Sequence, residues 1–328
     1  MGRISIEREI ALWKGGRPLG HAGTDAFRKL IDRNAGNIEG LSCTDMEVAK
    51  NSIEMKFSLV EKSAAAGCIS SARAEIARLA HAEGVDIFWT NQPGHAPEGH
   101  NEYFTTLAFP SLVSALVHAN SMHIHFETGP DAALHAYRQM NALAPWFLLN
   151  SREAGAGTDR LAIMREFIRE MGVLLLPQDF SSRSDYFAYM GECSRDVHRR
   201  LQDNGNLLRA KAGFWRLFDA GGMVQLTPDK VFHPARYRPD LMLENGNVSV
   251  ELRAIDGIGG MGKELDVLSA ATLVFDSAMG EPEITPMPLV REFYGTLSAR
   301  SKAYLRADEF VREAMKDAMG SYPEAVNE

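Results

Sequence analysis

Three short segments, far apart along the chain, alternate between apolar and polar residues. They cover residues 4–10, 122–127 and 248–253. Successive side chains of a β-strand point to opposite faces, so a period of two predicts a strand with one apolar and one polar face. Such half-buried strands are typical of antiparallel sheets. The alternation therefore constrains the chain to fold around a sheet that buries one face.

Between these strands the apolar residues recur with helical spacing. We expect helices over residues 24–32, 71–83, 107–119, 130–141, 158–171 and 185–202, a mainly helical part from 288 to 319, and further short strands at 57–61 and 85–90. Strands separated by helices of varied length predict an α+β fold with a twisted, mainly antiparallel sheet and helices packed on its outer face. No Pro/Ser/Gly-rich linker interrupts the chain, so we expect one domain over residues 1–328.

The polar faces of the three strands carry ionisable side chains. They are Glu7 and Glu9 on the first strand, His123, His125 and Glu127 on the second, and Glu251 and Arg253 on the third. These side chains could simply cover a solvated sheet face. However, Glu is a poor strand former and neighbouring carboxylates on one face repel each other, which favours cations between them. Hard divalent cations take oxygen ligands, with an occasional imidazole, so a metal site on a sheet face is the alternative.

The net charge and the cysteine content disfavour several classes of protein. The formal net charge is −8, from 43 acidic and 35 basic residues, which disfavours a nucleic-acid partner. The three cysteines are far apart and show no CxxC spacing, which fits a reducing compartment. The N-terminal residues do not form a signal peptide, and no apolar run approaches the ~20 residues of a spanning helix. We therefore expect a cytoplasmic protein with no membrane partner.

Two other motifs are weaker. The glycine-rich run 257–262 lacks the GK[ST] ending of a phosphate loop, so we expect a flexible connection or lid after the last strand. His95 and His100 lie in one loop but lack two further ligands at zinc-site spacing.

Four segments in order along the chain resemble the glutamate–cysteine ligases and related carboxylate–amine ligases of the glutamine synthetase superfamily. Residues 6–10 (IEREI) look like the first strand of that family, whose E-x-E pair holds metal. Glu54 and Glu61 match a second pair of acids seven apart, and residues 122–126 (MHIHF) resemble the H-x-[HN]-x strand, whose first histidine contacts metal or nucleotide. Residues 249–256 (SVELRAID) are similar to the late V-E-[VLF]-R-x-x-D strand, which supplies a metal-binding Glu and a catalytic Arg.

The resemblance implies a glutamine synthetase-like catalytic domain that uses ATP and Mg²⁺, with Mn²⁺ as an alternative metal. The implied reaction forms an amide bond, such as a γ-glutamyl bond, between a carboxylate and an amine through an acyl phosphate. The implied metal ligands are Glu7, Glu9, Glu54, Glu61, His123 and Glu251; His123, His125 and Arg253 would contact the nucleotide, and Arg253 and Glu251 would be catalytic. Because seven residues would place Glu54 and Glu61 on opposite faces of a regular strand, we also expect a β-bulge or a loop between them.

Two other functions remain open at this point. A metal-dependent amide hydrolase could use the same His/Glu cluster without nucleotide, and a non-catalytic relative could bind a nucleotide or metabolite. The expected partners are a small carboxylate and a small amine, and the sequence allows a homo-oligomer. Arg183, Arg236 and Arg238 are candidates for binding the substrate carboxylate, with plain solvent exposure as the alternative.

Overall fold

The computed structural model describes residues 3–47, 49–91, 119–152, 159–171, 178–186, 188–189, 235–238, 245–281 and 284–319. The strands are β1 (Arg3–Lys14), β2 (Arg17–Pro18), β3 (Leu41–Met46), β4 (Ser52–Glu61), β5 (Asp86–Phe88), β6 (Ser121–Thr128), β7 (Ala235–Arg238) and β8 (Val248–Asp256). The α-helices are α1 (His21–Arg33), α2 (Ala65–Glu83), α4 (Ala133–Asn150), α5 (Arg160–Met171), α9 (Met261–Ala278), α10 (Met287–Thr296) and α11 (Lys302–Met319), with short 3-10 turns at Ala35–Asn37, Lys62–Ala64 and Pro130–Ala132.

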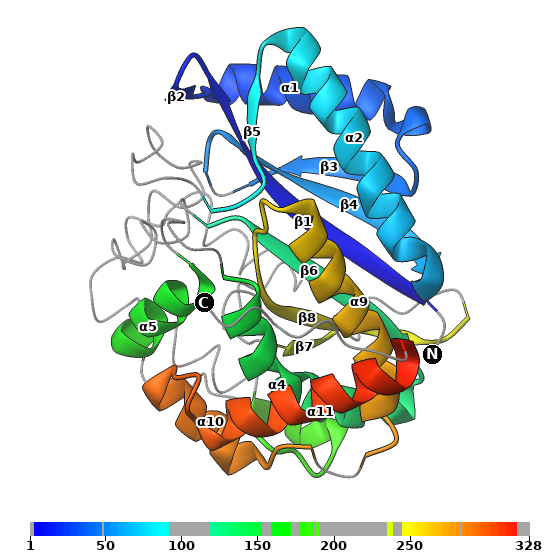
Figure 1. The fold of residues 1–328 in the computed structure, drawn as a ribbon, viewed down its shortest axis with the longest axis vertical. Coiled ribbons are helices and arrows are strands. Elements are labelled where there is room, and N and C mark those ends of the chain that lie inside the picture. Colours follow the sequence, from blue (N-terminus) through cyan, green and yellow to red (C-terminus); the bar gives the residue numbers. More distant parts are fainter. Residues whose placement is uncertain are drawn as a thin grey trace.

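The strands of the described residues form one sheet in the order β3-β4-β1-β6-β8-β7, with β2 and β5 paired to the end of β1. All the neighbouring strands run antiparallel. The long strand β1 lies near the middle and crosses the molecule diagonally, between the blue N-terminal strands and the green and yellow later ones (Figure 1). The expected α+β fold with a mainly antiparallel sheet is confirmed.

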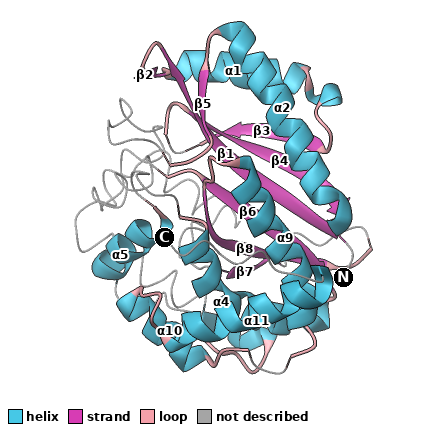
Figure 2. Ribbon diagram, in the orientation of Figure 1, coloured by secondary structure: helices cyan, strands magenta, loops and turns pink. Residues whose placement is uncertain are grey.

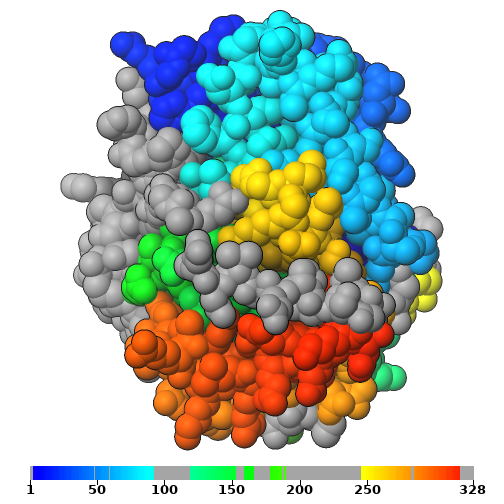
Figure 3. Space-filling view, in the orientation of Figure 1, coloured from blue at the N-terminus to red at the C-terminus, as the bar shows by residue number. Residues whose placement is uncertain are grey.

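One face of the sheet is the apolar core, and helices pack against it. On β1 the alternation holds as predicted: Ile4, Ile6 and Ile10 are buried on this face. The ring of Phe126 on β6 stacks on Phe275 of α9 at 4.1 Å between centroids. Helices α2 and α9 lie in front of the strands in Figure 2, with α1 at one end of the sheet and α11 at the other, and these helices with α10 provide most of the coloured surface on this side of the molecule in Figure 3. The other face of the sheet carries the ionisable side chains.

A bulge in β4 changes which of its residues share a face. Opposite β1, the partner of Ile6 is Phe57 but the partner of Ile4 is Val60, so β4 contains one extra residue between these pairs. Without it, Glu54 and Glu61 would point to opposite faces; with it, both lie on the face of Glu7 and Glu9. The expected irregularity between the two acids is therefore present.

Several element boundaries differ from those expected. Helix α1 begins at His21, three residues before the expected start at residue 24, and the hydroxyl of Thr24 is buried and donates to the carbonyl of Gly20 at 3.1 Å. Strand β3 and helix α9 were not predicted, and the strand expected at 57–61 begins at Ser52. Most of the helix expected at 107–119, most of the helix expected at 185–202, and both His95 and His100 lie outside the described residues.

The connection after β8 is held by two buried arginines and is not a free lid. Arg8 donates to the carbonyl of Ile258 at 3.0 Å, and Arg73 of α2 donates to the same carbonyl at 3.1 Å and to that of Gly259 at 2.5 Å. Among the described residues, none of the helices combines the length and apolar character needed to cross a membrane.

Candidate functional site

The ionisable side chains form rows across the sheet, because residues directly opposite each other on antiparallel strands share a face. One row joins Lys56, Glu7 and His123 across β4, β1 and β6. The next row on one side pairs Glu54 with Glu9, and the next on the other side joins Ser5, His125 and Glu251. The strand register thus gathers acids that are up to 244 residues apart in the chain, between Glu7 and Glu251.

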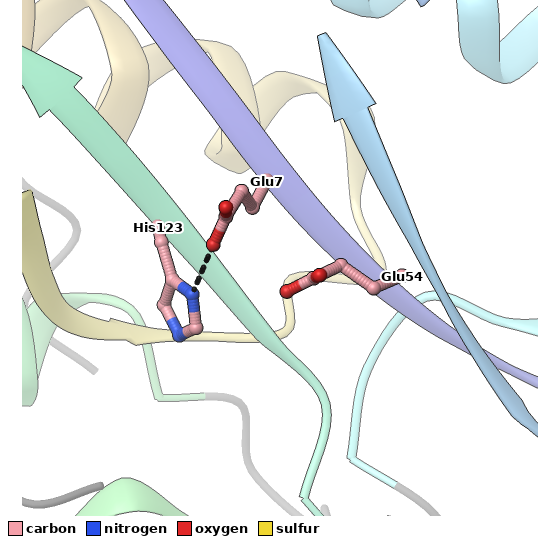
Figure 4. A group of neighbouring side chains, drawn as sticks. All are labelled: Glu7, Glu54 and His123. Atoms are coloured by element: carbon pink, nitrogen blue, oxygen red, sulfur yellow. Dashed lines mark hydrogen bonds and ion pairs between the residues drawn. The ribbon is translucent and has the colours of Figure 1, made fainter. Parts of the chain in front are cut away.

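At the centre, Glu7, Glu54 and His123 come from three adjacent strands and point toward one another (Figure 4). Each offers a possible metal-ligand atom, and the three atoms lie within 4.8 Å of one another. The Nδ1 atom of His123 lies 3.2 Å from Oε2 of Glu7.

A second group joins Glu7, His125 and Glu251 within the same 4.8 Å limit. The Nε2 atom of His125 lies 3.5 Å from Glu7 Oε2 and 4.0 Å from Glu251 Oε1. This Nε2 atom is buried and has no hydrogen-bond partner within the described part of the chain. The other ring nitrogen, Nδ1, lies 3.3 Å from the hydroxyl of Ser249.

A third group of possible ligands contains Glu9, Glu47 and Glu54. Glu47 follows β3 directly and was not among the predicted site residues, because strand β3 itself was not recognised. Burial raises the pKa of Glu54 well above its usual value, and the negative charges of Glu47, Glu7 and Glu9 raise it further. Lys56 Nζ, 3.1 Å from Glu54 Oε2, offsets only part of this repulsion.

The carboxyl groups of Glu7 and Glu251 behave in the opposite way. Burial by itself would raise the pKa of Glu7, but the adjacent imidazoles of His123 and His125 outweigh it and hold that pKa well below its usual value. Burial opposes ionisation of Glu251 too, yet the positive charge of Arg253 and the neighbouring imidazoles hold the pKa of Glu251 below its usual value. Both groups are therefore carboxylates at neutral pH.

Two arginines border the acids. Arg253 donates from Nη1 to Oε1 of Glu251 on its own strand. Arg160, the first residue of α5, is buried and its Nη2 lies 2.7 Å from Nε2 of His123. Burial, then the charge of Arg253 and that of Arg160, lower the pKa of His123 despite the nearby Glu7, so this imidazole is neutral. Arg160 was missed from the sequence; its one signal is a cation in the first turn of a helix, where the dipole disfavours it.

Glu61 lies in none of these three groups. It is opposite Arg3 in the register of β4 and β1, about 13 Å along the strand from Glu7 at ~3.3 Å per residue. Arg3 also approaches Glu127 at 3.8 Å. The predicted role of Glu61 as a metal ligand thus concerns the other end of the same sheet face.

The donor set fits a divalent cation of the hard type. The two groups around Glu7 supply carboxylate oxygens and, in each group, one imidazole nitrogen, from His123 or from His125. Mg²⁺ and Mn²⁺ accept ligands of these two types. A buried imidazole nitrogen without a hydrogen-bond partner beside two carboxylates, and a carboxyl whose pKa is raised by burial and by like charges, are both relieved by a cation. The arrangement can therefore hold divalent metal, and Arg253 places a guanidinium at its edge.

No family model matches this sequence, and no curated protein does. Similar folds occur among solved structures, which include the following three. A bifunctional glutathione synthetase from Pasteurella multocida is 13% identical, over 98% of this chain and 46% of its own, with a TM-score of 0.49. A glutamine synthase homolog is 12% identical over 98% and 68%, with a TM-score of 0.44, and the complex of the prokaryotic ubiquitin-like protein Pup with its ligase PafA is 11% identical over 100% and 59%, with a TM-score of 0.43.

The chain spans about half the length of the first of these proteins. At identities of 11–13% and TM-scores below 0.5, these likenesses do not assign the chain to a family. Its function has to be argued from its own residues.

Proposed function

We propose that this chain is an ATP- and Mg²⁺-dependent ligase that joins a carboxylate to an amine. The observation that carries the proposal is the sheet face on which Glu7, Glu9, Glu54 and Glu251 converge with two histidines. These are the residues on which the sequence resembles the carboxylate–amine ligases. A solvated sheet face would not need a buried Glu251, with 0% of its surface exposed, beside a buried His125.

The chemistry explains why such a face is needed. A carboxylate is a poor acyl donor, so the γ-phosphoryl group of ATP is first transferred to it; the amine then attacks the acyl phosphate and releases inorganic phosphate. Bound Mg²⁺ supplies charge neutralisation on the phosphoryl oxygens and aligns the triphosphate. The carboxylates would hold the cations, and the planar guanidinium of Arg253 would hold the transferring phosphoryl group by paired hydrogen bonds.

The proposal specifies the substrates by their chemical class, a carboxylic acid and an amine. An amide with a γ-glutamyl bond is one product of this type. Arg236 and Arg238 lie on β7 opposite Glu251 and Ser249 in the strand register, and they remain candidates for binding the substrate carboxylate.

Phosphate release from Mg·ATP across a panel of amino acids and amines tests the proposal. We expect ADP and phosphate only with a matching acid–amine pair, and a product lighter than their sum by one water in mass spectrometry. Amide cleavage without ATP would instead identify a metal-dependent hydrolase. Binding of Mg·ATP without turnover of any pair would identify a non-catalytic relative.

Charge-neutral variants locate the activity. Glu9→Gln should abolish ATP turnover while the protein stays folded, because one charge is removed from a repelling cluster. Glu83→Gln, an exposed position at the end of α2, is the matched control and should retain turnover. Full activity of Glu9→Gln would remove the sheet face from the mechanism.

A further inference from the structure

Arg160, the first residue of α5, brings a second guanidinium to the sheet face that carries the acids. It lies outside the segments on which the sequence resembles the ligases. The residue is 8% exposed, and its Nη2 atom lies 2.7 Å from Nε2 of His123. Its Nε atom is buried and has no hydrogen-bond partner among the described residues. Because a buried charged donor is costly to leave unpaired, this N–H needs an acceptor from outside them.

The first turn of α5 is fixed against the sheet by two carboxyl groups. Asp256, the last residue of β8, accepts the backbone N–H of Arg160 at 2.7 Å. Asp159, just before the helix, accepts the N–H of Ala162 at 2.7 Å. Both groups pair backbone donors that a helix start otherwise leaves unsatisfied. The side chain of Arg160 therefore extends over the sheet from a backbone that is held in place.

Arg253 approaches the same place from β8. It donates to Glu251, whose Oε1 lies 3.6 Å from Nδ1 of His123, the ring that Arg160 also contacts. The Nε atom of Arg253 is likewise buried without a hydrogen-bond partner in the part of the chain that the structure describes. Burial lowers the pKa of Arg160; the charge of Glu9 opposes this and that of Arg253 adds to it. Two guanidinium groups that repel each other, each with an unpaired N–H, are stabilised by an anion that both can bind.

The shape of a phosphoryl group fits this pair better than that of a carboxylate. A carboxylate has two oxygens in one plane, whereas a phosphoryl group has three that point in different directions. It can therefore accept from two guanidinium groups and still reach cations held by the acids. We infer that Arg160 and Arg253 together bind the phosphoryl group that passes from ATP to the substrate carboxylate, which makes Arg160 a catalytic residue. This inference rests on the proposed function.

The pair would keep its contact with phosphorus through both steps of the reaction. In the first step, the bond from the γ-phosphorus to the bridging oxygen of ADP breaks, and a bond to a carboxylate oxygen forms. In the second step, the amine attacks the acyl carbon, and that oxygen leaves with the phosphorus as inorganic phosphate, which takes up the proton that the amine loses. Phosphate is therefore a ligand of the same two residues, and it can be tested without knowing the acid or the amine.

Calorimetric titration of the full chain with inorganic phosphate, in the presence of Mg·ADP, tests the inference. Wild type should bind phosphate, and Arg160→Gln should bind it about 10- to 100-fold more weakly, because a charge-assisted hydrogen bond is lost. Arg160→Lys keeps the charge without the guanidinium geometry and should lose part of the affinity. The affinity for Mg·ADP should stay unchanged in both variants. Arg165→Gln, exposed on the same helix, is the matched control and should bind phosphate as wild type does.

Three results would overturn the inference. Unchanged phosphate affinity in Arg160→Gln would exclude Arg160 from the phosphoryl site. Loss of phosphate and Mg·ADP binding together in both Arg160 variants would make it a structural residue. Wild-type protein that binds Mg·ADP but no phosphate would end the inference without the need for a variant to fold. In each case turnover of Mg·ATP with an acid–amine pair would leave the ligase standing, whereas wild type that neither binds Mg·ADP nor turns over any pair would end both.

Discussion

Glu54 is the residue where like charge is most crowded. It is buried, it lies beside Glu9 across the strands, and its pKa is raised by burial and by the charges of Glu47, Glu7 and Glu9. In the absence of metal this carboxyl therefore opposes folding. A residue of this kind is retained at the expense of stability when it has a ligand to bind.

Replacing Glu54 by Gln should therefore stabilise the metal-free protein, instead of costing the ~1 kcal/mol of a typical substitution. The same change should remove most of the stabilisation that Mg²⁺ or Mn²⁺ gives to the wild-type protein. Thermal unfolding with and without metal measures both effects. A lower melting temperature of metal-free Glu54→Gln would contradict the argument.

Asp256 gives the protein a predictable pH dependence. Burial raises its pKa from 3.8 to about 6, although the Arg160 N–H at 2.7 Å and the Asn91 amide at 3.2 Å favour the carboxylate. The folded state thus binds this proton more tightly than the unfolded chain, so the stability that the proton contributes is fully present below about pH 4 and is lost as the pH rises through about 6.

A shift of about 2 units corresponds to about 3 kcal/mol, lost between pH 4 and pH 7. Asp256→Asn does not titrate, so its free energy of unfolding relative to wild type should improve by that amount over this pH range. Denaturant titrations at pH 4, 5, 6 and 7 measure the difference. A difference that stays constant with pH would show that Asp256 is ionised throughout.

The sequence predicted which site residues share a face of the sheet, because residues two apart on a strand point the same way. This alternation places Glu7 and Glu9 on one face of β1 and His123 and His125 on one face of β6, and the strand register then brings the two pairs together. Alternation within a strand cannot identify Arg160, because no short-range pattern shows that the start of α5 reaches β6.

At the scale of elements, the segment after β8 depends on a close backbone approach. Gly257 donates its N–H to the carbonyl of Asn120 at 2.8 Å. A Cβ at Gly257 would lie 2.7 Å from the carbonyl oxygen of Trp89, and 3.0 Å and 3.1 Å from Asn120 Cβ and O. The segment next to the site therefore leaves no space for a side chain at this position.

Gly257→Ala should lower the free energy of unfolding by about 1–3 kcal/mol, as overpacking does. Gly262→Ala is the matched control with the opposite expected sign. It lies in the first turn of α9 with open space around it, where alanine is favoured over glycine by up to about 1 kcal/mol. Denaturant unfolding of the two variants measures the contrast; equal effects would show that the segment adjusts freely.

The strands that the sequence predicted well are those in which apolar and polar residues alternate without interruption. Strands β6 and β8 were both predicted over most of their length, because the alternation of apolar and polar residues in them is unbroken. Strand β3 and the first half of β4 were missed because Asp45, Ser52 and Glu54 are poor strand formers, and tertiary pairing overrides that propensity. Helix α9 was missed because the glycine-rich run before it indicated a loop.

At the scale of the whole molecule, one buried ionic cluster ties distant parts of the chain together. Arg8 of β1 lies on the apolar face between the site residues Glu7 and Glu9, 1% exposed, and its Nε is 2.8 Å from Glu264 Oε1 in α9. Arg73 of α2 pairs with the same carboxylate. Both guanidinium groups lie over the ring of Trp89, at 5.8 Å and 4.4 Å from its centroid. The cluster links the site strand to two helices and to the segment after β8.

Glu264→Gln removes the one carboxylate that pairs with both arginines in this cluster and leaves two buried cations facing each other. Breaking a buried ion pair in this way costs about 3–5 kcal/mol, because the remaining charge stays desolvated. The exposed pair Arg78–Glu75 on α2, at 2.6 Å, is the matched control, and Glu75→Gln should cost less than about 1 kcal/mol. Since the cluster joins β1, α2 and α9, the loss should appear as one cooperative transition at lower denaturant concentration, seen equally by circular dichroism and by tryptophan fluorescence. Equal small costs for the two variants would mean that apolar packing alone holds the helices to the strand that carries the site.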